Sequence, residues 1–155
     1  MNQETEQNVW RRVQGGNSLP ADRALLPERL EQMYLEQRML AESLGDLARR
    51  SGGSDRAVLN QLASENADRA RELRTLHDLL TGRQLKLKLP REPGREPMEE
   101  ALRRAYQAQR QAARSFRLLE REFSDYEEDF SAMAREADRH SRLISRVLNR
   151  KLGQN

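Results

Sequence analysis

The chain has 155 residues, a length typical of a single domain with one core. Charged residues make up 34% of the sequence and hydrophobic residues 36%, with only 5% aromatic, a composition that favours helices over strands. Cys is absent, which excludes disulfides, thiolate metal sites and a Cys nucleophile.

The formal net charge is +3, from 28 Lys and Arg residues against 25 Asp and Glu residues. This near balance does not favour a nucleic-acid partner. The sequence has no run of about 18 apolar residues that could cross a bilayer, and its first residues lack the pattern of a secretory signal. We therefore expect a cytoplasmic protein without a membrane partner.

Residues 1–22 form a polar N-terminal segment, and we expect its Trp10 to pack on the surface of the domain that follows. Residues 23–152 carry the periodic pattern of that domain. In four segments, apolar residues recur with alternating steps of three and four, as in helices that pack lengthwise against one another. The four stripes are Leu26, Leu30, Met33, Gln37, Leu40, Leu44 and Leu47; Leu59, Leu62, Asn66, Arg69, Leu73, Leu76 and Leu80; Leu102, Ala105, Gln109, Ala112, Phe116, Leu119 and Phe123; and Tyr126, Phe130, Met133, Ala137, His140, Ile144 and Val147.

We predict helices over residues 25–50, 55–81, 97–122 and 125–151. Pro27 and Pro97 suit first-turn positions, where the missing N–H costs nothing. Ser54 is a candidate N-cap, and Gly82 is a candidate C-terminal stop. Ser124 and Glu127 have the spacing of a capping box at the start of the last helix.

The connection over residues 82–96 decides the topology. Extended at about 3.3 Å per residue, it reaches roughly 45–50 Å, whereas a helix of about 24 residues is about 36 Å long. It can therefore run the full length of the bundle, while the two shorter links must join antiparallel neighbours. The expected fold is all-α, a ferritin-like four-helix bundle with one long crossover between the second and third helices. We expect the alternating Lys and Leu residues over 86–89 to lie along the bundle with the Leu side chains inward.

Each stripe is interrupted near its middle, at Gln37, Asn66, Arg69, Gln109, Ala137 and His140. Antiparallel packing would bring these positions to one level of the core. The spacing is repeated in the two halves of the chain: the second-helix pair follows Gln37 by 29 and 32 residues, and the fourth-helix pair follows Gln109 by 28 and 31. Two helical hairpins with the same internal plan are the simplest account.

This layout resembles the rubrerythrin branch of the ferritin-like superfamily over about residues 25–150, and the sequences LASENADRAR at 62–71 and LLTGR at 79–83 are similar to that family. In such di-iron bundles the first and third helices each supply a Glu, and the second and fourth each supply Glu-x-x-His. The resemblance places the two single Glu positions on Gln37 and Gln109. It places the two motifs on Asn66 with Arg69 and on Ala137 with His140. Of all these positions, only His140 still carries a residue type that the family uses as a metal ligand.

These departures indicate that the family's metal chemistry is not inherited. Carboxylates neutralise the charge of ferrous ions, whereas amides are neutral and weak ligands, and Arg69 would repel a metal. We expect a non-catalytic bundle with a structural or interaction role, no cofactor and no metal, whose polar core residues bond to one another. Arg69 would take the volume and charge of the lost metal, with Glu65 as the nearest anion by helical spacing. Replacing Arg69 by Leu should be tolerated, whereas replacing it by Glu should be badly destabilising unless a metal were restored.

Two other functions stay open. Glu36, Glu65 and Glu136 each precede a carried-over ligand position by one residue and are candidate ligands of a shifted site. The chain would then be a di-iron or manganese oxidoreductase acting on peroxide or oxygen, although a one-residue slip turns a helix by about 100° and takes these carboxylates off the stripe. Alternatively, the connection over 83–95 and the Arg-rich last helix would bind an anionic partner.

Two surface features complete the expectations. Tyr34, Leu35 and Met39 form an edge through which the chain could form a homodimer. His77 lies near the end of the second predicted helix, where a positive charge is favourable.

Overall fold

The computed structural model describes residues 25–90 and 96–153, and these residues form four long helices and no strand. The helices are α3 (Leu26–Arg49), α4 (Gly53–Thr81), α5 (Met98–Glu122) and α6 (Glu127–Gly153), with a 3-10 turn, η1 (Ser124–Tyr126), before α6. Every predicted helix end lies within two residues of the observed one, which confirms the all-α prediction. The polar segment 1–22 and its Trp10 lie outside the described residues.

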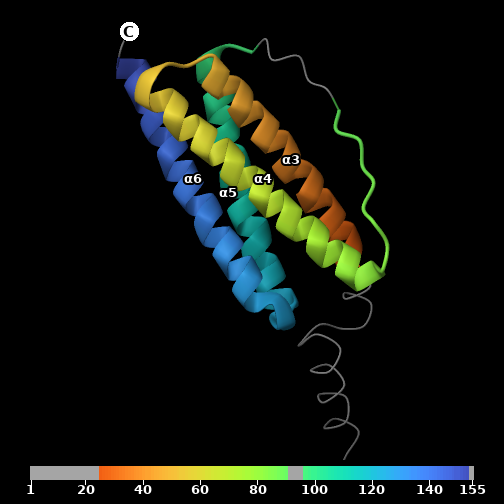
Figure 1. Ribbon diagram of the computed structural model, residues 1–155. Helices are drawn as coiled ribbons and strands as arrows, with labels where there is room; N and C mark the ends of the chain where they lie inside the picture. Colours follow the sequence, from red (N-terminus) through yellow and green to blue (C-terminus); the bar gives the residue numbers. More distant parts are fainter. Residues whose placement is uncertain (1–24, 91–95, 154–155) are drawn as a thin grey trace, which may run out of the picture.

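The four helices form a bundle of two antiparallel hairpins (Figure 1). α3 packs along α4, and α5 packs along α6, while the contacts between α3 and α5 and between α4 and α6 are fewer. Residues 82–90 leave the end of α4 and run outside α3 toward the end of the bundle at which α5 begins (Figure 1). The described part of the connection, residues 82–90, therefore extends lengthwise along the bundle, as the length of the connection predicts.

Two hydrophobic clusters fill the core, one toward each end of the bundle. The first cluster contains the three buried phenylalanines, Phe116, Phe123 and Phe130. The second cluster is aliphatic and consists mainly of Leu40, Leu44, Leu47, Leu59, Leu62, Leu102, Ile144 and Val147. The interrupted stripe positions lie between these clusters, so a polar level divides the core into two apolar halves.

The stripes predicted from the sequence are buried over most of their length. The exceptions lie at the ends of two stripes, where Leu76, Leu80 and Tyr126 are only half-buried. At the end of α4 the buried position is His77 in place of Leu76. The period of a straight helix differs slightly from that of a strict heptad, so a stripe drifts around the helix over several turns.

The first three helix starts differ in part from their predicted caps. Pro27 lies in the first turn of α3, as predicted, whereas Pro97 is the N-cap of α5. The Ser54 prediction was wrong, because α4 begins at Gly53 and its N-cap is Gly52, without a side-chain hydrogen bond. Gly53 has a φ of 57°, a conformation that glycine adopts without strain, and this lets the helix start two residues earlier than predicted.

The capping box predicted at the start of α6 is not formed. The Tyr126 backbone N–H donates to the Phe123 carbonyl at 3.0 Å and closes the 3-10 turn η1. Ser124 is inside this turn and makes no side-chain cap, so α6 begins only at Glu127. Phe123 is 1% exposed, and the burial of its ring anchors the link between α5 and α6 in place of a polar cap.

Gly82 ends α4 in the left-handed conformation, with a φ of 68°, and its N–H donates to the Asp78 carbonyl at 2.8 Å. A Cβ at this position would meet open space, so backbone conformation alone disfavours other residues. We expect Gly82→Ala to lower the free energy of unfolding by about 1 kcal/mol in urea denaturation. The matched variant Gly52→Ala changes a glycine with equal space but a φ of −127°, and it should have a clearly smaller effect. Equal losses in the two variants would contradict this explanation.

The described ends of the crossover are held by two hydrogen bonds. The Leu85 N–H donates to Asp78 Oδ1 at 2.9 Å, and Arg50 Nη2 donates to the Glu96 carbonyl at 2.8 Å. The expectation that all the Leu side chains of this segment point inward was only partly right. Leu89 is half-buried, but Leu87 is 43% exposed, because the convex surface of one helix leaves little room to bury every second side chain.

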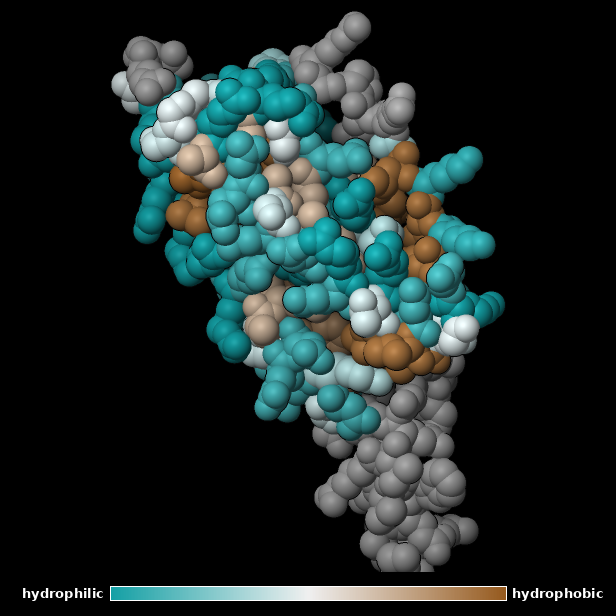
Figure 2. Space-filling view, viewed as in Figure 1, coloured by the Kyte–Doolittle hydropathy of each residue, from teal (hydrophilic) through white to brown (hydrophobic). Residues whose placement is uncertain are grey.

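Hydrophilic side chains cover most of the face formed by α4 and α6 (Figure 2). Hydrophobic surface gathers beside the crossover and at the end of the bundle where α4 ends (Figure 2). Leu79, near the end of α4, is 78% exposed. None of the helices in the described part of the chain is both long and apolar enough to span a bilayer.

Candidate functional site

The interrupted stripe positions meet at one level of the core, between the two hydrophobic clusters. Their polar members come from all four helices, and each is at most 2% exposed. We call this set the polar layer: Gln37 of α3, Asn66 and Arg69 of α4, Gln109 of α5 and His140 of α6. Ala137 of α6 is also buried at this level and contributes no polar group.

Arg69 lies at the centre of the polar layer, with a side chain that is 1% exposed and a Cζ atom 5.7 Å from the centroid of the Phe116 ring. Its Nη1 donates to Gln37 Oε1 at 2.8 Å and to Gln109 Oε1 at 3.4 Å. Its Nη2 donates to Glu136 Oε1 at 2.8 Å. Burial lowers the pKa of Arg69 below its ordinary value, while Glu136 raises it, and the guanidinium stays a cation.

The guanidinium also sets the orientation of the amides. Because Arg69 can only donate, Gln37 must present its Oε1 atom to it. Asn66 Nδ2 donates to the same Oε1 atom at 2.8 Å. Asn66 Oδ1 then points away from Gln37 and accepts from Gln109 Nε2 at 2.8 Å. One permanent cation therefore fixes the direction of a chain of hydrogen bonds across three helices.

His140 joins this chain to the edge of the core. Its Nε2 lies 2.7 Å from Glu65 Oε2, and its Nδ1 lies 2.9 Å from Asn66 Oδ1 and 3.3 Å from Arg69 Nη2. Burial, and then the positive charge of Arg69, lower the pKa of His140 from 6.5 to about 4, so the ring is neutral at pH 7. We assign its proton to Nε2, because a lone pair there would face the carboxylate of Glu65. Nδ1 then accepts from Arg69 Nη2 and from Gln109 Nε2, each at 3.3 Å, and its contact with Asn66 Oδ1 at 2.9 Å joins two acceptors and is not a hydrogen bond.

The anion that pairs with Arg69 is Glu136 of α6, and the prediction of Glu65 from helical spacing was wrong. Glu65 instead accepts from His140 and from Arg139 Nη2, the latter at 2.6 Å. The side chain of Arg69 extends across the core to α6, so its guanidinium pairs with a carboxylate of that helix and not with Glu65, four residues before it on α4. Burial alone would raise the pKa of Glu65, but the hydrogen bonds that it accepts together lower it.

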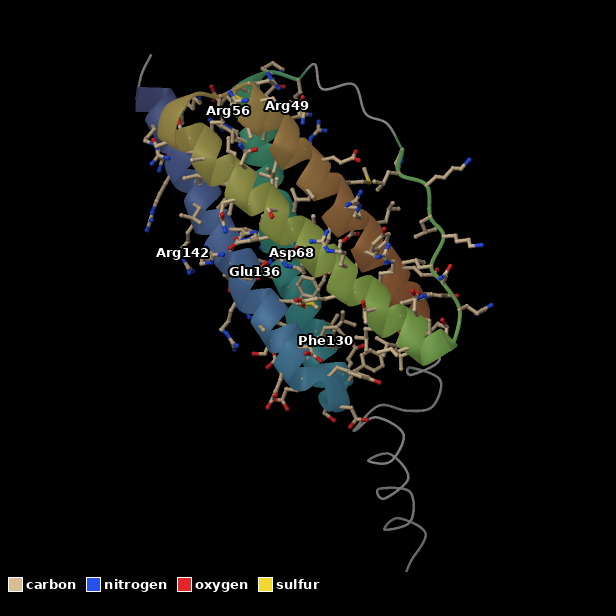
Figure 3. All side chains as sticks on the ribbon, in the orientation of Figure 1. Arg49, Arg56, Asp68, Phe130, Glu136 and Arg142 are labelled. Carbon is tan, nitrogen blue, oxygen red and sulfur yellow. The ribbon has the colours of Figure 1, made fainter. Side chains whose placement is uncertain are left out.

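Two of the three shifted candidate ligands lie together, and the third does not. One ligand atom each from Glu65, Glu136 and His140 lies within 4.8 Å of the others, where α4 meets α6. Figure 3 shows Glu136 in this position. Glu36 is exposed on α3, and among the described residues it accepts only from Gln32, at 3.3 Å. The three carboxylates therefore do not form one site.

The side chains of the polar layer do not fit a di-iron centre. Gln37 and Asn66 offer neutral carbonyl oxygens that already accept hydrogen bonds, and Ala137 offers no ligand. Two ferrous ions would add four positive charges to a buried level that already contains Arg69. The donor set suits a guanidinium and its hydrogen bonds, not a pair of hard cations.

A second buried histidine, His77, has partners that the sequence did not suggest. It is 4% exposed, with Nε2 3.0 Å from Glu31 Oε1 of α3 and Nδ1 3.0 Å from Asp78 Oδ1. The hydrogen bond from His77 is the main cause that lowers the pKa of Asp78, which also accepts the Leu85 N–H of the crossover. His77 therefore links α4 to α3 and, through Asp78, to the crossover. This role differs from the one expected from the sequence, which was a favourable positive charge near the end of a helix.

No protein-family model matches the chain, and neither does any curated protein or solved structure. The function of the chain must therefore be inferred from the chemistry of its described side chains.

Proposed function

We propose that the chain is a non-catalytic ferritin-like bundle, a degenerate relative of the rubrerythrins, with a structural or interaction role and a metal-free polar core. The observation that supports this proposal is the position of Arg69. Its buried guanidinium lies at the level where the resemblance places metal ligands, and it binds Gln37, Gln109 and Glu136.

Arg69 supplies what a metal would supply at this level. It provides a permanent positive charge, and the carbonyl oxygens of Gln37 and Gln109 turn toward that charge. Glu136 gives the compensating negative charge at 2.8 Å. The pair is formally neutral, so any additional cation would bring uncompensated charge into the core.

Metal analysis tests the proposal directly. Protein purified from cells supplied with iron and manganese should carry well below one equivalent of either metal per chain, because the polar layer offers no charge to neutralise it. Two equivalents per chain would contradict the proposal. The double variant Glu65→Gln/Glu136→Gln separates the possible sources: a metal content that disappears in this variant would place the ion at the shifted carboxylates.

A di-iron or manganese oxidoreductase acting on peroxide or oxygen is the second candidate function. The observation that favours it is the convergence of Glu65, Glu136 and His140. Against it, each carboxylate already binds an arginine, Arg139 at 2.6 Å and Arg69 at 2.8 Å. The cluster offers two carboxylates and one imidazole, a set too small to hold two ions.

A homodimer also stays a prediction, as does a cytoplasmic location. Tyr34, Leu35 and Met39 are all half-buried within the chain. Met39 lines a groove that also includes Ala63 and Ala67 of α4, and a second copy of the chain could pack there.

A further inference from the structure

The small net charge of the chain conceals a strong segregation of charge along the α5–α6 hairpin. Residues 101–119 contain five arginines and no acidic residue, and residues 139–153 contain four arginines, one lysine and no acidic residue. Residues 120–138, between them, contain eight acidic residues and two arginines. Because α5 and α6 are antiparallel, the two basic stretches lie side by side in the part of the hairpin away from η1 (Figure 1).

Ion pairs neutralise only some of these arginines. Arg103 pairs with Glu99 at 2.7 Å, and Arg150 pairs with Asp55 of α4 at 2.6 Å. Four others are exposed and have no ion-pair partner within residues 25–90 and 96–153. We call these four the basic face: Arg110 and Arg114 of α5, and Arg142 and Arg146 of α6.

Helical spacing places the basic face along the outer seam between α5 and α6. The ion pair between Arg117 and Asp138 marks this seam. Arg110 precedes Arg117 by two helical turns, and Arg142 follows Asp138 by about one turn. Within each helix the two arginines are four residues apart, about 6 Å along the axis. Figure 3 shows Arg142 on the side of α6 turned away from α4.

We propose that the basic face binds duplex nucleic acid through its phosphate backbone, without sequence preference. Guanidinium groups bind phosphates with two parallel hydrogen bonds, and such contacts carry no sequence information. The near-zero net charge argued against a nucleic-acid partner, but that value averages a basic region with an acidic one. This inference goes beyond the proposed function and does not depend on the polar layer.

The side chains around the basic face favour phosphates over a protein or a membrane. Gln107 and Gln111 are exposed among the arginines. The exposed large hydrophobic residues of α5 and α6 are Leu118 and Leu152, which follow Arg114 and Arg146 toward opposite ends of the hairpin. A protein interface would need an apolar centre, and a membrane surface would need apolar side chains to insert. Tyr106 is half-buried, so no exposed aromatic ring of α5 offers the stacking that single strands use.

The test is binding of the full chain to a fluorescent duplex of about 20 base pairs while the salt is raised from about 50 to 200 mM. Four phosphate contacts predict a slope of log K against log salt of about −3.6. The double variant Arg110→Gln/Arg114→Gln should bring the slope to about −1.8, and so should Arg142→Gln/Arg146→Gln. Gln is a good helix former, and the four side chains have no ion-pair partner to lose in the part of the chain that the structure describes, so these variants should keep the thermal stability of the parent.

The matched control is Arg56→Gln/Arg74→Gln, which removes two exposed arginines of α4 that lie outside the basic face, of which Arg74 has a coulombic attraction to Asp78. It should leave the affinity and the slope unchanged. No binding at the lowest salt, or equal losses in the control, would overturn the proposal. Equal competition by polyglutamate or by anionic lipid vesicles at matched charge would also overturn it, because the face would then recognise another class of partner. Failure here would leave the metal-free polar layer intact, since none of these variants touches it.

Discussion

The variant Arg69→Glu should lose at least about 4 kcal/mol of stability in urea denaturation, or fail to fold. It would replace a buried cation by a third carboxylate close to Glu65 and Glu136. Its oxygens would also face two carbonyl acceptors, Gln37 Oε1 and Gln109 Oε1, which Arg69 now satisfies as a donor. Every contact that the guanidinium makes would change from attraction to repulsion.

The control is Arg69→Leu, which removes the same contacts without reversing the charge. Gln109 Oε1 would lose a donor, but Glu136 is 36% exposed and can turn to water. The variant also removes a buried guanidinium whose Nε has no hydrogen-bond partner among the described residues. These opposing effects should leave Arg69→Leu within about 1 kcal/mol of the parent. If Leu were as damaging as Glu, the sign of the charge would not matter, and the role proposed for Arg69 would be wrong.

Stability should also fall as the pH is lowered from about 6.5 to 4, because His140 is neutral in the fold and titrates at 6.5 in the unfolded chain. In this window the unfolded chain binds more protons, so acid favours unfolding. The stability contributed by the neutral ring is fully present above pH 6.5 and is lost by about pH 4. A shift of this size corresponds to about 3 kcal/mol, measured by urea denaturation at a series of pH values.

The variant His140→Gln isolates this contribution from that of the carboxylates, which also titrate in acid. Its amide can still donate to Glu65 but cannot take up a proton. The stability difference between the parent and the variant should therefore shrink by about 3 kcal/mol from pH 7 to 4. A difference that does not change with pH would contradict this, because it would mean that His140 has the same pKa in the folded and the unfolded chain.

Periodicity was sufficient to predict the helices and most of the core. On α3 and α5 every residue of the predicted stripe is buried, because an amphipathic helix can bury only one face. The length of the connection over 82–96 predicted that it runs along the bundle. The same stripes predicted the residues of the polar layer, because a polar residue at a stripe position is visible in the sequence as an interruption of the apolar pattern.

The partners within the layer could not be predicted in the same way. Spacing along one helix ranks Glu65 as the neighbour of Arg69, but Glu136 is 67 residues away and reaches Arg69 only through the packing of α6 on α4. The partnership of His77 with Glu31 likewise joins residues 46 apart in sequence. The caps failed for a different reason: burial of Phe123 and the conformation of a glycine determined those helix starts, and neither is visible in a capping motif.

The polar layer has a consequence for how the two hairpins are aligned. Leucine stripes repeat, so sliding one hairpin along the other by a helical turn, about 5.4 Å, would still bury apolar side chains. Hydrogen bonds are directional and short, and Arg69 of the first hairpin can reach Gln109 and Glu136 of the second at only one height. Buried polar groups are known to select one register at some expense in stability. The polar layer thus selects one alignment of the two hairpins, whereas apolar packing alone would allow several.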